Sequence, residues 1–453
     1  MLRAGDVFLH GIHALDSSGG FAGPLDVSVT NGVITGLGRN LKPVAGQPVI
    51  DGQGLWLLPG IFDGHLHTGL ASYDALELMN TPISRRILET AQILKRTVEA
   101  GVTFVRDAGI TDAGVRDAVA DGLVPGPTLQ VCVVAIGATG GHGDGFLAGP
   151  GRDCPVDYSL PDYPGRPPYL VDGPEEMRKA VRTVLRSGAD WIKLLATGGV
   201  LSAGDGEFEP ELTDEEIGVA VTEAGRRRKP VMVHALGGPA IASAVTAGAR
   251  SIEHGVFLSE ADAELMAARG CALVPTLAIY HRLAGQARAG NFAGLRASRA
   301  LAVGEHLGES VAIARAAGVT IALGSDFGHR DDHGSNLEEI GLLHGAGLTL
   351  EEALLAATRA GAELCGVEHR LGRLEPGYEF DAVLLDADPS DLQTYTSCTS
   401  VTRVFKRGAA VVRHPRLELS RRSGVRRGGA VSDRSERTSA RGLTPARSRQ
   451  PRP

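Results

Sequence analysis

One lysine lies inside an apolar run of the chain. Lys193 stands between Ile192 and Leu194, and the run ends in two glycines, a pattern typical of a buried parallel strand and its exit turn. A buried ammonium group is costly unless it is paired or chemically changed. One such change is reaction with carbon dioxide, which turns the amine into a carbamate that can bridge two metal ions. The hypothesis of a carbamate on Lys193 therefore requires metal ligands elsewhere in the chain.

Five further side chains have the chemistry of metal ligands, and each follows a short apolar run. They are His65, His67, His234, His254 and Asp326. Because residues i and i+2 of a strand point to the same side, His65 and His67 could face one ion. Taken singly, each histidine could be an ordinary polar residue at a strand end, and Asp326 could cap the next helix. The five residues together with the buried lysine predict a metal site.

The types of ligand also indicate the metal. Imidazole and carboxylate groups suit zinc, and manganese, cobalt or iron are the alternatives. Two metal ions that share a hydroxide lower the pKa of its parent water toward neutrality. The predicted cofactors are therefore two divalent metal ions, with zinc as the first choice, and a carbamate on Lys193.

The predicted ligands belong to a repeating alternation of strands and helices. The expected strands are residues 57–63, 103–107, 129–134, the run around Lys193, 231–234, 251–254, 272–275 and 320–324. Amphipathic helices separate them, and one begins at Thr213 with the pattern of a capping box. Eight such strands predict an α/β fold, a (β/α)₈ TIM barrel, in which catalytic residues lie at the carboxyl ends of the strands. Each predicted ligand falls at such an end.

Short β-like runs flank the barrel at both ends of the chain and predict a small β-sandwich that both ends build. We expect the first part of this β-sandwich at 1–58, the TIM-barrel metallohydrolase domain at 59–370 and the second part at 371–414. Residues 415–453 are rich in Arg, Ser, Gly and Pro, so we expect a basic disordered tail there.

The bulk composition excludes some classes of partner. The 453 residues carry a formal charge of −7, which gives no overall basic bias toward nucleic acid or anionic membranes. The five cysteines are scattered without a CxxC pair, and the first residues lack the apolar core of a signal peptide, so we expect a cytoplasmic protein. No apolar stretch is long enough to span a bilayer. The expected partners are a small-molecule substrate and further copies of the chain in a homo-oligomer.

Several segments resemble the metal-dependent amidohydrolase superfamily, over essentially residues 1–412. Residues 58–67 look like its first-strand motif, and residues 371–382 look like its return into the β-sandwich. Within the superfamily, residues 140–144 and 193–200 are similar to the binuclear branch of Xaa-Pro dipeptidases, Xaa-Arg/Lys carboxypeptidases and ochratoxin-type amidases.

This resemblance implies a role for each site residue. His65 and His67 would bind one metal ion together with Asp326, His234 and His254 would bind the second, and carboxylated Lys193 would bridge both. Asp326 would also take a proton from the attacking hydroxide and deliver it to the leaving amine. His142 would hydrogen-bond the substrate carbonyl or carboxylate, and the alternative for His142 is a loop histidine in a glycine-rich turn.

One residue departs from the family pattern. Relatives usually carry Tyr or His two positions after the histidine of the fifth strand, where it can polarise the scissile carbonyl, but here that residue is Leu236. Leucine cannot donate a hydrogen bond. Either the metal ions polarise the carbonyl alone, or a residue such as His142 or Tyr280 does so, or the substrate differs. Arg282 is a further candidate, as a ligand for a substrate carboxylate.

Three functions compete. The first is a binuclear metal hydrolase in which a metal-bridging hydroxide attacks an amide bond of a small substrate such as a dipeptide or an N-acyl amino acid. The second is a mononuclear deaminase or a hydrolase of cyclic amides or imidazolones, and Lys193 argues against it because those branches generally lack the bridging lysine. The third is a barrel scaffold without catalysis, and the presence of all six predicted ligands argues against it.

Overall fold

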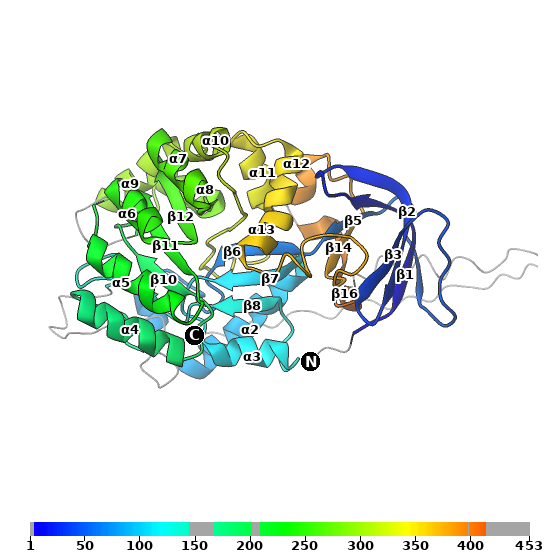
Figure 1. Cartoon of the computed structure of the whole chain (residues 1–453), viewed down its shortest axis with the longest axis horizontal. Helices are drawn as coiled ribbons and strands as arrows, with labels where there is room; N and C mark the ends of the chain where they lie inside the picture. Colours follow the sequence, from blue (N-terminus) through cyan, green and yellow to red (C-terminus); the bar gives the residue numbers. More distant parts are fainter. Residues whose placement is uncertain (1–3, 145–166, 202–208, 397, 414–453) are drawn as a thin grey trace, which may run out of the picture. The chain divides into compact units, whose positions relative to one another are not determined.

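A ring of parallel strands forms the centre of the chain (Figure 1). The computed structural model describes residues 4–144, 167–201, 209–396 and 398–413. The barrel strands are β6 (Ile61–Leu66), β7 (Val102–Asp107), β8 (Thr128–Val131), β9 (Ala135–Ile136), β10 (Ile192–Leu195), β11 (Val231–Gly237), β12 (Ser251–Phe257) and β13 (Ala272–Val274). They form one parallel sheet in the order β6-β7-β8 and a second in the order β9-β10-β11-β12-β13.

The expected third strand, 129–134, is interrupted. Val133 takes a left-handed backbone conformation with φ 68°, so the strand ends as β8 and resumes as β9. The backbone amides of Asp190 and Trp191 donate to the Val131 carbonyl at 2.8 and 3.3 Å, which joins β8 to the segment that enters β10. The ring therefore continues across the break between the two sheets.

The eighth position of the ring has no regular strand where residues 320–324 predicted one. A single parallel bridge joins Ile321 to Leu273, and the Gly64 amide donates to the Leu323 carbonyl at 2.7 Å. The Leu323 amide instead donates to the Ala356 carbonyl of a helix, which explains why no ladder forms. These bonds connect β13 through the eighth segment back to β6.

Helices separate the strands and cover the outside of the ring. They are α1 (Ala75–Asn80), α2 (Ile83–Glu99), α3 (Ala113–Ala120), α4 (Pro174–Arg186), α5 (Asp214–Gly225), α6 (Pro239–Ala247), α7 (Glu260–Arg269), α8 (Leu277–Arg288), α9 (Gly294–Glu305), α10 (Glu309–Ala316), α11 (Glu338–Gly345), α12 (Leu350–Ala356) and α13 (Arg359–Leu364). The capping box predicted at Thr213 is present, since Thr213 and Glu216 cap each other at the start of α5.

A third, mostly antiparallel sheet, the outer sheet, draws its strands from both ends of the chain, as the blue and orange strands of Figure 1 show. Its strands are β1 (Val7–Leu15), β2 (Phe21–Thr30), β3 (Val33–Gly38), β4 (Val49–Asp51), β5 (Trp56–Pro59), β14 (Ala382–Leu385), β15 (Val401–Lys406) and β16 (Ala409–Arg413). The predicted strand 57–63 is in fact two strands, β5 in this sheet and β6 in the barrel, separated at Gly60. A Cβ at Gly60 would lie 2.0 Å from Thr103 Oγ1, so the close approach there requires glycine.

The outer sheet and the barrel share one apolar core. Leu58 and Val383 of the outer sheet belong to the same cluster of buried residues as Val102 of the barrel. The tail predicted for 415–453 lies outside the described residues. Within the described part of the chain, no helix is both long and apolar enough to cross a membrane.

Candidate metal centre

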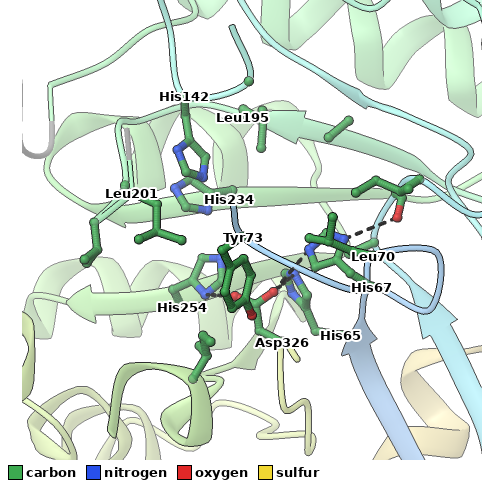
Figure 2. Close-up of a pocket in the computed structure, with 18 of the residues that line it drawn as sticks. His65, His67, Leu70, Tyr73, His142, Leu195, Leu201, His234, His254 and Asp326 are labelled. Carbon is green, nitrogen blue, oxygen red and sulfur yellow. Dashed lines mark hydrogen bonds and ion pairs between the residues drawn. The ribbon is translucent and has the colours of Figure 1, made fainter. Parts of the chain in front are cut away.

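The carboxyl ends of the barrel strands surround a cavity of about 350 Å³. Its lining includes all seven residues that the sequence predicts for the site: His65, His67, His142, Lys193, His234, His254 and Asp326. Figure 2 shows His65, His67, His254 and Asp326 turned toward one another, with His142 beside His234. One ligand atom each from His65, His254 and Asp326 lie within 4.8 Å of one another. The fold therefore gathers residues from distant strands into one place.

His65 and His67 present nitrogen lone pairs to a carboxylate. The Nδ1 atom of His67 lies 3.2 Å from the Gly109 carbonyl, which can only accept, so Nδ1 carries the hydrogen and Nε2 of the neutral ring does not. In His65 the same role falls to Glu253, whose Oε2 lies 2.7 Å from Nδ1. The two Nε2 atoms nevertheless lie 3.3 and 3.1 Å from Asp326 Oδ1. Three electron-pair donors that converge in this way fit a shared cation.

His234 and His254 complete the histidine group. His234 Nε2 lies 3.2 Å from the Gly198 carbonyl, which leaves Nδ1 as its ligand atom, and its ring centroid is 4.5 Å from that of His254. The Nδ1 atom of His254 lies 2.7 Å from Thr276 Oγ1. Second contacts of this kind fix the orientation of metal-binding histidines. Both rings therefore fit a metal site.

Lys193 enters the same centre as a buried amine that lies beside His65. The residue is 2% exposed, and its Nζ lies 3.4 Å from His65 Nε2. No described carboxylate lies within 4.0 Å of this nitrogen, and burial lowers the pKa of the lysine. A neutral amine is the form of lysine that reacts with carbon dioxide.

Arg106 and Glu253 form a buried ion pair next to the cavity residue His65. Both Glu253 oxygens lie 2.9 Å from Arg106 Nη2, and the guanidinium also donates to Gly64 and Ser251. Burial alone would raise the pKa of Glu253, but the charges of Arg106 and His65 hold it below its usual range. Arg106 and Glu253 therefore fix His65 from behind. Their positions inside apolar strands were the only sequence signal for them, and the sequence analysis did not identify them.

Two further buried aspartates shape the segments that carry the ligands. Asp63 accepts hydrogen bonds from His65 N at 3.1 Å, from Ser325 Oγ at 2.6 Å and from Asn336 Nδ2 at 2.8 Å. Asp107 accepts from the backbone and hydroxyl of Thr68 at 2.7 and 2.6 Å. Burial raises the pKa of both carboxyls, and these donors act against that rise. Asp63 thus ties the first ligand segment to the one that carries Asp326.

Unusual backbone conformations cluster around the same cavity. His254 and Asp326, both predicted ligands, have φ values of 75° and 55°, and the β-branched residues Ile110 and Thr276 have 86° and 51°. Such conformations cost on the order of 1–3 kcal/mol each in residues with a side chain. They persist where the surrounding structure holds them, which is typical of functional sites.

The pKa values of the histidines at the centre shift in different directions. Burial acts to lower the pKa of His67, but the neighbouring Asp326 carboxylate raises it above its usual value. Burial lowers the pKa values of His234 and His254 well below the usual value. For Asp326, burial acts to raise the pKa, but the His65 and His67 rings hold it well below its ordinary value. Asp326 is therefore ionised, and its carboxylate oxygens are suited to bind a metal ion.

His142 lies over His234, with ring centroids 4.5 Å apart. Burial lowers its pKa to about 4, so the ring is neutral at neutral pH. The space for the ring depends on Gly199, because a Cβ there would lie 2.6 Å from His142 Cε1. His142 is thus packed against the centre and lines the cavity.

Two residues that the sequence analysis discussed are not among the residues that line the cavity. Leu236 packs in an apolar cluster with Tyr280 and Val303, and the pairing of β11 with β12 is irregular between Ala235 and Gly237. Arg282 does not line it either. Its guanidinium binds Asp332 and Glu338 and covers the Phe327 ring at 4.6 Å, so it is not free for a substrate.

Known proteins are similar to this chain in both sequence and fold. Residues 56–411 match the Amidohydrolase family. Ochratoxinase from Aspergillus niger is 32% identical over 363 residues, which cover 78% of this chain and 75% of that protein. The solved structure of that ochratoxinase has a TM-score of 0.79 and 28% identity, with 91% of this chain and 96% of that chain covered.

A prolidase solved in complex with N-methylphosphonate-L-proline has a TM-score of 0.83 and 31% identity, with 90% of this chain and all of that chain covered. The structural neighbours are TIM barrels with a small β-sandwich, which confirms the predicted fold class. Enzymes of this family generally use divalent metal ions and act on small molecules. The chain belongs to the amidohydrolase family and is a hydrolase that acts on C–N bonds.

Proposed function

We propose that this protein is a binuclear metal hydrolase that cleaves the amide bond of a small substrate such as a dipeptide or an N-acyl amino acid. The observation that carries the proposal is the convergence of four histidines, Asp326 and the buried Lys193 on one cavity. A mononuclear site would need no buried lysine beside its histidines.

The proposed ligand set follows from this arrangement. His65, His67 and Asp326 would hold one ion, His234 and His254 the second, and a carbamate on Lys193 would bridge them. The carbamate forms when the neutral amine adds to carbon dioxide and releases one proton. When bound, divalent ions of this kind polarise an amide carbonyl and lower the pKa of water. Zinc suits the nitrogen and oxygen donors.

The chain itself supplies the proton transfers. Asp326 accepts a proton at a carboxylate oxygen from the attacking water, and then donates it to the nitrogen of the leaving amine as the C–N bond breaks. The neutral His142 ring, held against His234, donates a hydrogen bond to the substrate at its carbonyl or its carboxylate.

The walls of the cavity support a substrate with an apolar part and a carboxylate. Ile110, Ile279 and Leu283 lie among its many apolar lining residues. Arg296 also lines it, is exposed, and has no ion-pair partner among the described residues, while its guanidinium lies 5.8 Å from the Phe292 ring centroid. Dipeptides and N-acyl amino acids both offer a carboxylate to such a cation.

The decisive experiment combines metal analysis with a change at the bridge. Protein purified without chelator should contain two divalent ions per chain and hydrolyse members of a library of dipeptides, N-acyl amino acids, lactams and carbamates. We expect Lys193→Ala to lower kcat by on the order of 10³-fold or more and to lose metal, with partial rescue by short carboxylic acids.

The matched control is Lys179→Ala, which removes an exposed lysine from α4 and should leave activity and metal content unchanged. Full activity in Lys193→Ala would refute the bridging role. Fewer than one metal ion per chain in active wild-type protein would refute the metal mechanism. Turnover of lactams alone would favour the hydrolase of cyclic amides.

A further inference from the structure

Amide hydrolysis requires a group that stabilises the carbonyl oxygen of the substrate, in addition to the residues proposed as metal ligands. As water adds to the carbonyl carbon, negative charge grows on the carbonyl oxygen, and a fixed hydrogen-bond donor there stabilises the transition state. The segment after His234 offers no such side chain, because Ala235 and Leu236 are apolar and Leu236 does not line the cavity. A donor in addition to His142 and the metal ions therefore has to come from another wall.

Tyr280, in the first turn of α8, packs against His254 at the edge of the centre. Its ring meets the His254 ring edge-on, with centroids 5.4 Å apart and planes at 82°. The residue lines the cavity although it is only 4% exposed. Its hydroxyl has no hydrogen-bond partner among the described residues and is not sealed from the cavity. An otherwise buried phenol thus keeps its polar atom available.

The other hydroxyls of the cavity are already engaged. Ser72 Oγ donates to Glu77 at 2.7 Å, and Tyr73 Oη accepts from the Gly328 amide at 2.9 Å. Tyr169 has an interaction partner of its own. Among the described hydroxyls that line the cavity, Tyr280 is therefore the one with its full hydrogen-bonding capacity unused.

We propose that the Tyr280 hydroxyl donates a hydrogen bond to the scissile carbonyl oxygen of the substrate, a role that Leu236 cannot fill. This inference rests on the proposed amide hydrolysis. Tyr280 transfers no proton, so its O–H bond stays intact throughout. The hydrogen bond from Tyr280 strengthens while the carbonyl oxygen gains charge, and it weakens again when the carbonyl reforms and the amine leaves. Tyr280 would act on the transition state more strongly than on the bound substrate.

The test is Tyr280→Phe, which keeps the ring and its packing on His254 and removes only the hydroxyl. We expect kcat to fall on the order of 10²–10³-fold with little change in KM. The N-methylphosphonate derivatives of L-proline and L-phenylalanine carry a tetrahedral phosphorus in place of the carbonyl carbon. Calorimetry with these compounds should show a comparable loss of affinity in the variant, while affinity for the free amino acids stays the same.

Tyr73→Phe is the matched control, since it removes a second hydroxyl from the same cavity and should have a much smaller effect. Metal content and the unfolding midpoint of each variant establish that the fold and the centre are intact. Unchanged kcat and unchanged phosphonate affinity in Tyr280→Phe would overturn the role of Tyr280 and leave the hydrolase proposal standing. Wild-type protein that neither hydrolyses amides nor binds the phosphonates would instead overturn the proposed function, and this inference with it.

Discussion

Arg106 and Lys193 are two buried cations on strands of the same barrel, at 0% and 2% exposure, and their surroundings differ. Arg106 binds the Glu253 carboxylate and lies 4.5 Å over the Trp191 ring. Lys193 faces an imidazole nitrogen and has no carboxylate within ion-pair distance in the described part of the chain. A buried charge that the fold itself neutralises supports the structure. A buried amine with no carboxylate beside it needs a different partner, and we propose that carbon dioxide and metal ions supply it.

We expect the largest change when the buried ion pair of Arg106 is removed, and it is a change in the free energy of unfolding. Arg106→Met would leave Glu253 buried without its partner and should lower the free energy of unfolding by about 3–5 kcal/mol. Arg282→Met is the control: Arg282 also binds carboxylates and covers an aromatic ring, but its side chain is 29% exposed, so the loss should be about 1 kcal/mol. Urea denaturation of both variants, in the presence of chelator, measures the difference. Equal losses would contradict the assignment of Arg106 to a structural role.

We expect a smaller effect, on metal affinity, at Thr276, whose hydroxyl contacts the proposed metal ligand His254. Thr276→Val keeps a β-branched side chain at φ 51° but removes the Oγ1 that lies 2.7 Å from His254 Nδ1. Loss of such a contact typically lowers metal affinity about 10–100-fold. Thr402→Val removes an equally buried hydroxyl, which donates to Leu384 in the outer sheet, and should leave metal affinity unchanged. Competition with a chelator measures both, and identical affinities would show that Thr276 does not orient His254.

We expect the smallest effect at His333, a buried residue outside the cavity, where a substitution should change only the pH dependence of stability. His333 is 4% exposed, and neither ring nitrogen has a hydrogen-bond partner among the described residues. It does not line the cavity. Burial lowers its pKa from 6.5 to about 3, with the nearby Leu70 backbone acting weakly in the opposite direction. Lack of a partner alone therefore does not mark a site, and position at the cavity is the second requirement.

The sign of the pH dependence follows from this shift. Between pH 6.5 and about 3 the unfolded chain binds a proton at His333 that the folded chain does not, so acid lowers the stability of the wild type. His333→Leu removes that contribution, and its unfolding midpoint should rise relative to the wild type as the pH falls through this range. Denaturation curves at several pH values measure the gap, and a constant gap would contradict the prediction.

The sequence predicted which residues gather at the cavity because the relevant rule is local. A strand ends where its apolar run ends, and in a barrel that end faces the cavity, so His65, His234 and Asp326 could be placed without any knowledge of their neighbours. The rule cannot be extended to the residue two positions after His234. The i and i+2 periodicity alone would put Leu236 on the same side as His234, but the pairing of β11 with β12 is irregular after Ala235 and Leu236 packs in an apolar cluster.

The supporting residues could not be predicted because their partners are far apart in the chain. Arg106 meets Glu253, and Asp63 meets Asn336, across more than 140 and 270 residues respectively. Nothing near any of these residues in the sequence says which opposite charge or hydrogen-bond donor it will face. The conformations of Val133 and Asp326 likewise depend on tertiary packing, and they interrupt strands that the residue pattern alone would continue.

The outer sheet has a consequence for how the chain is made. Trp56 of β5 pairs with Leu385 of β14, so one edge of β5 stays without its partner until more than 300 further residues have been synthesised. At about 5–20 residues per second, that edge is open for on the order of half a minute. An open strand edge is where wrong pairing and aggregation begin. The period in which the nascent chain is vulnerable is thus determined by the late return of β14, after the whole barrel has already been synthesised.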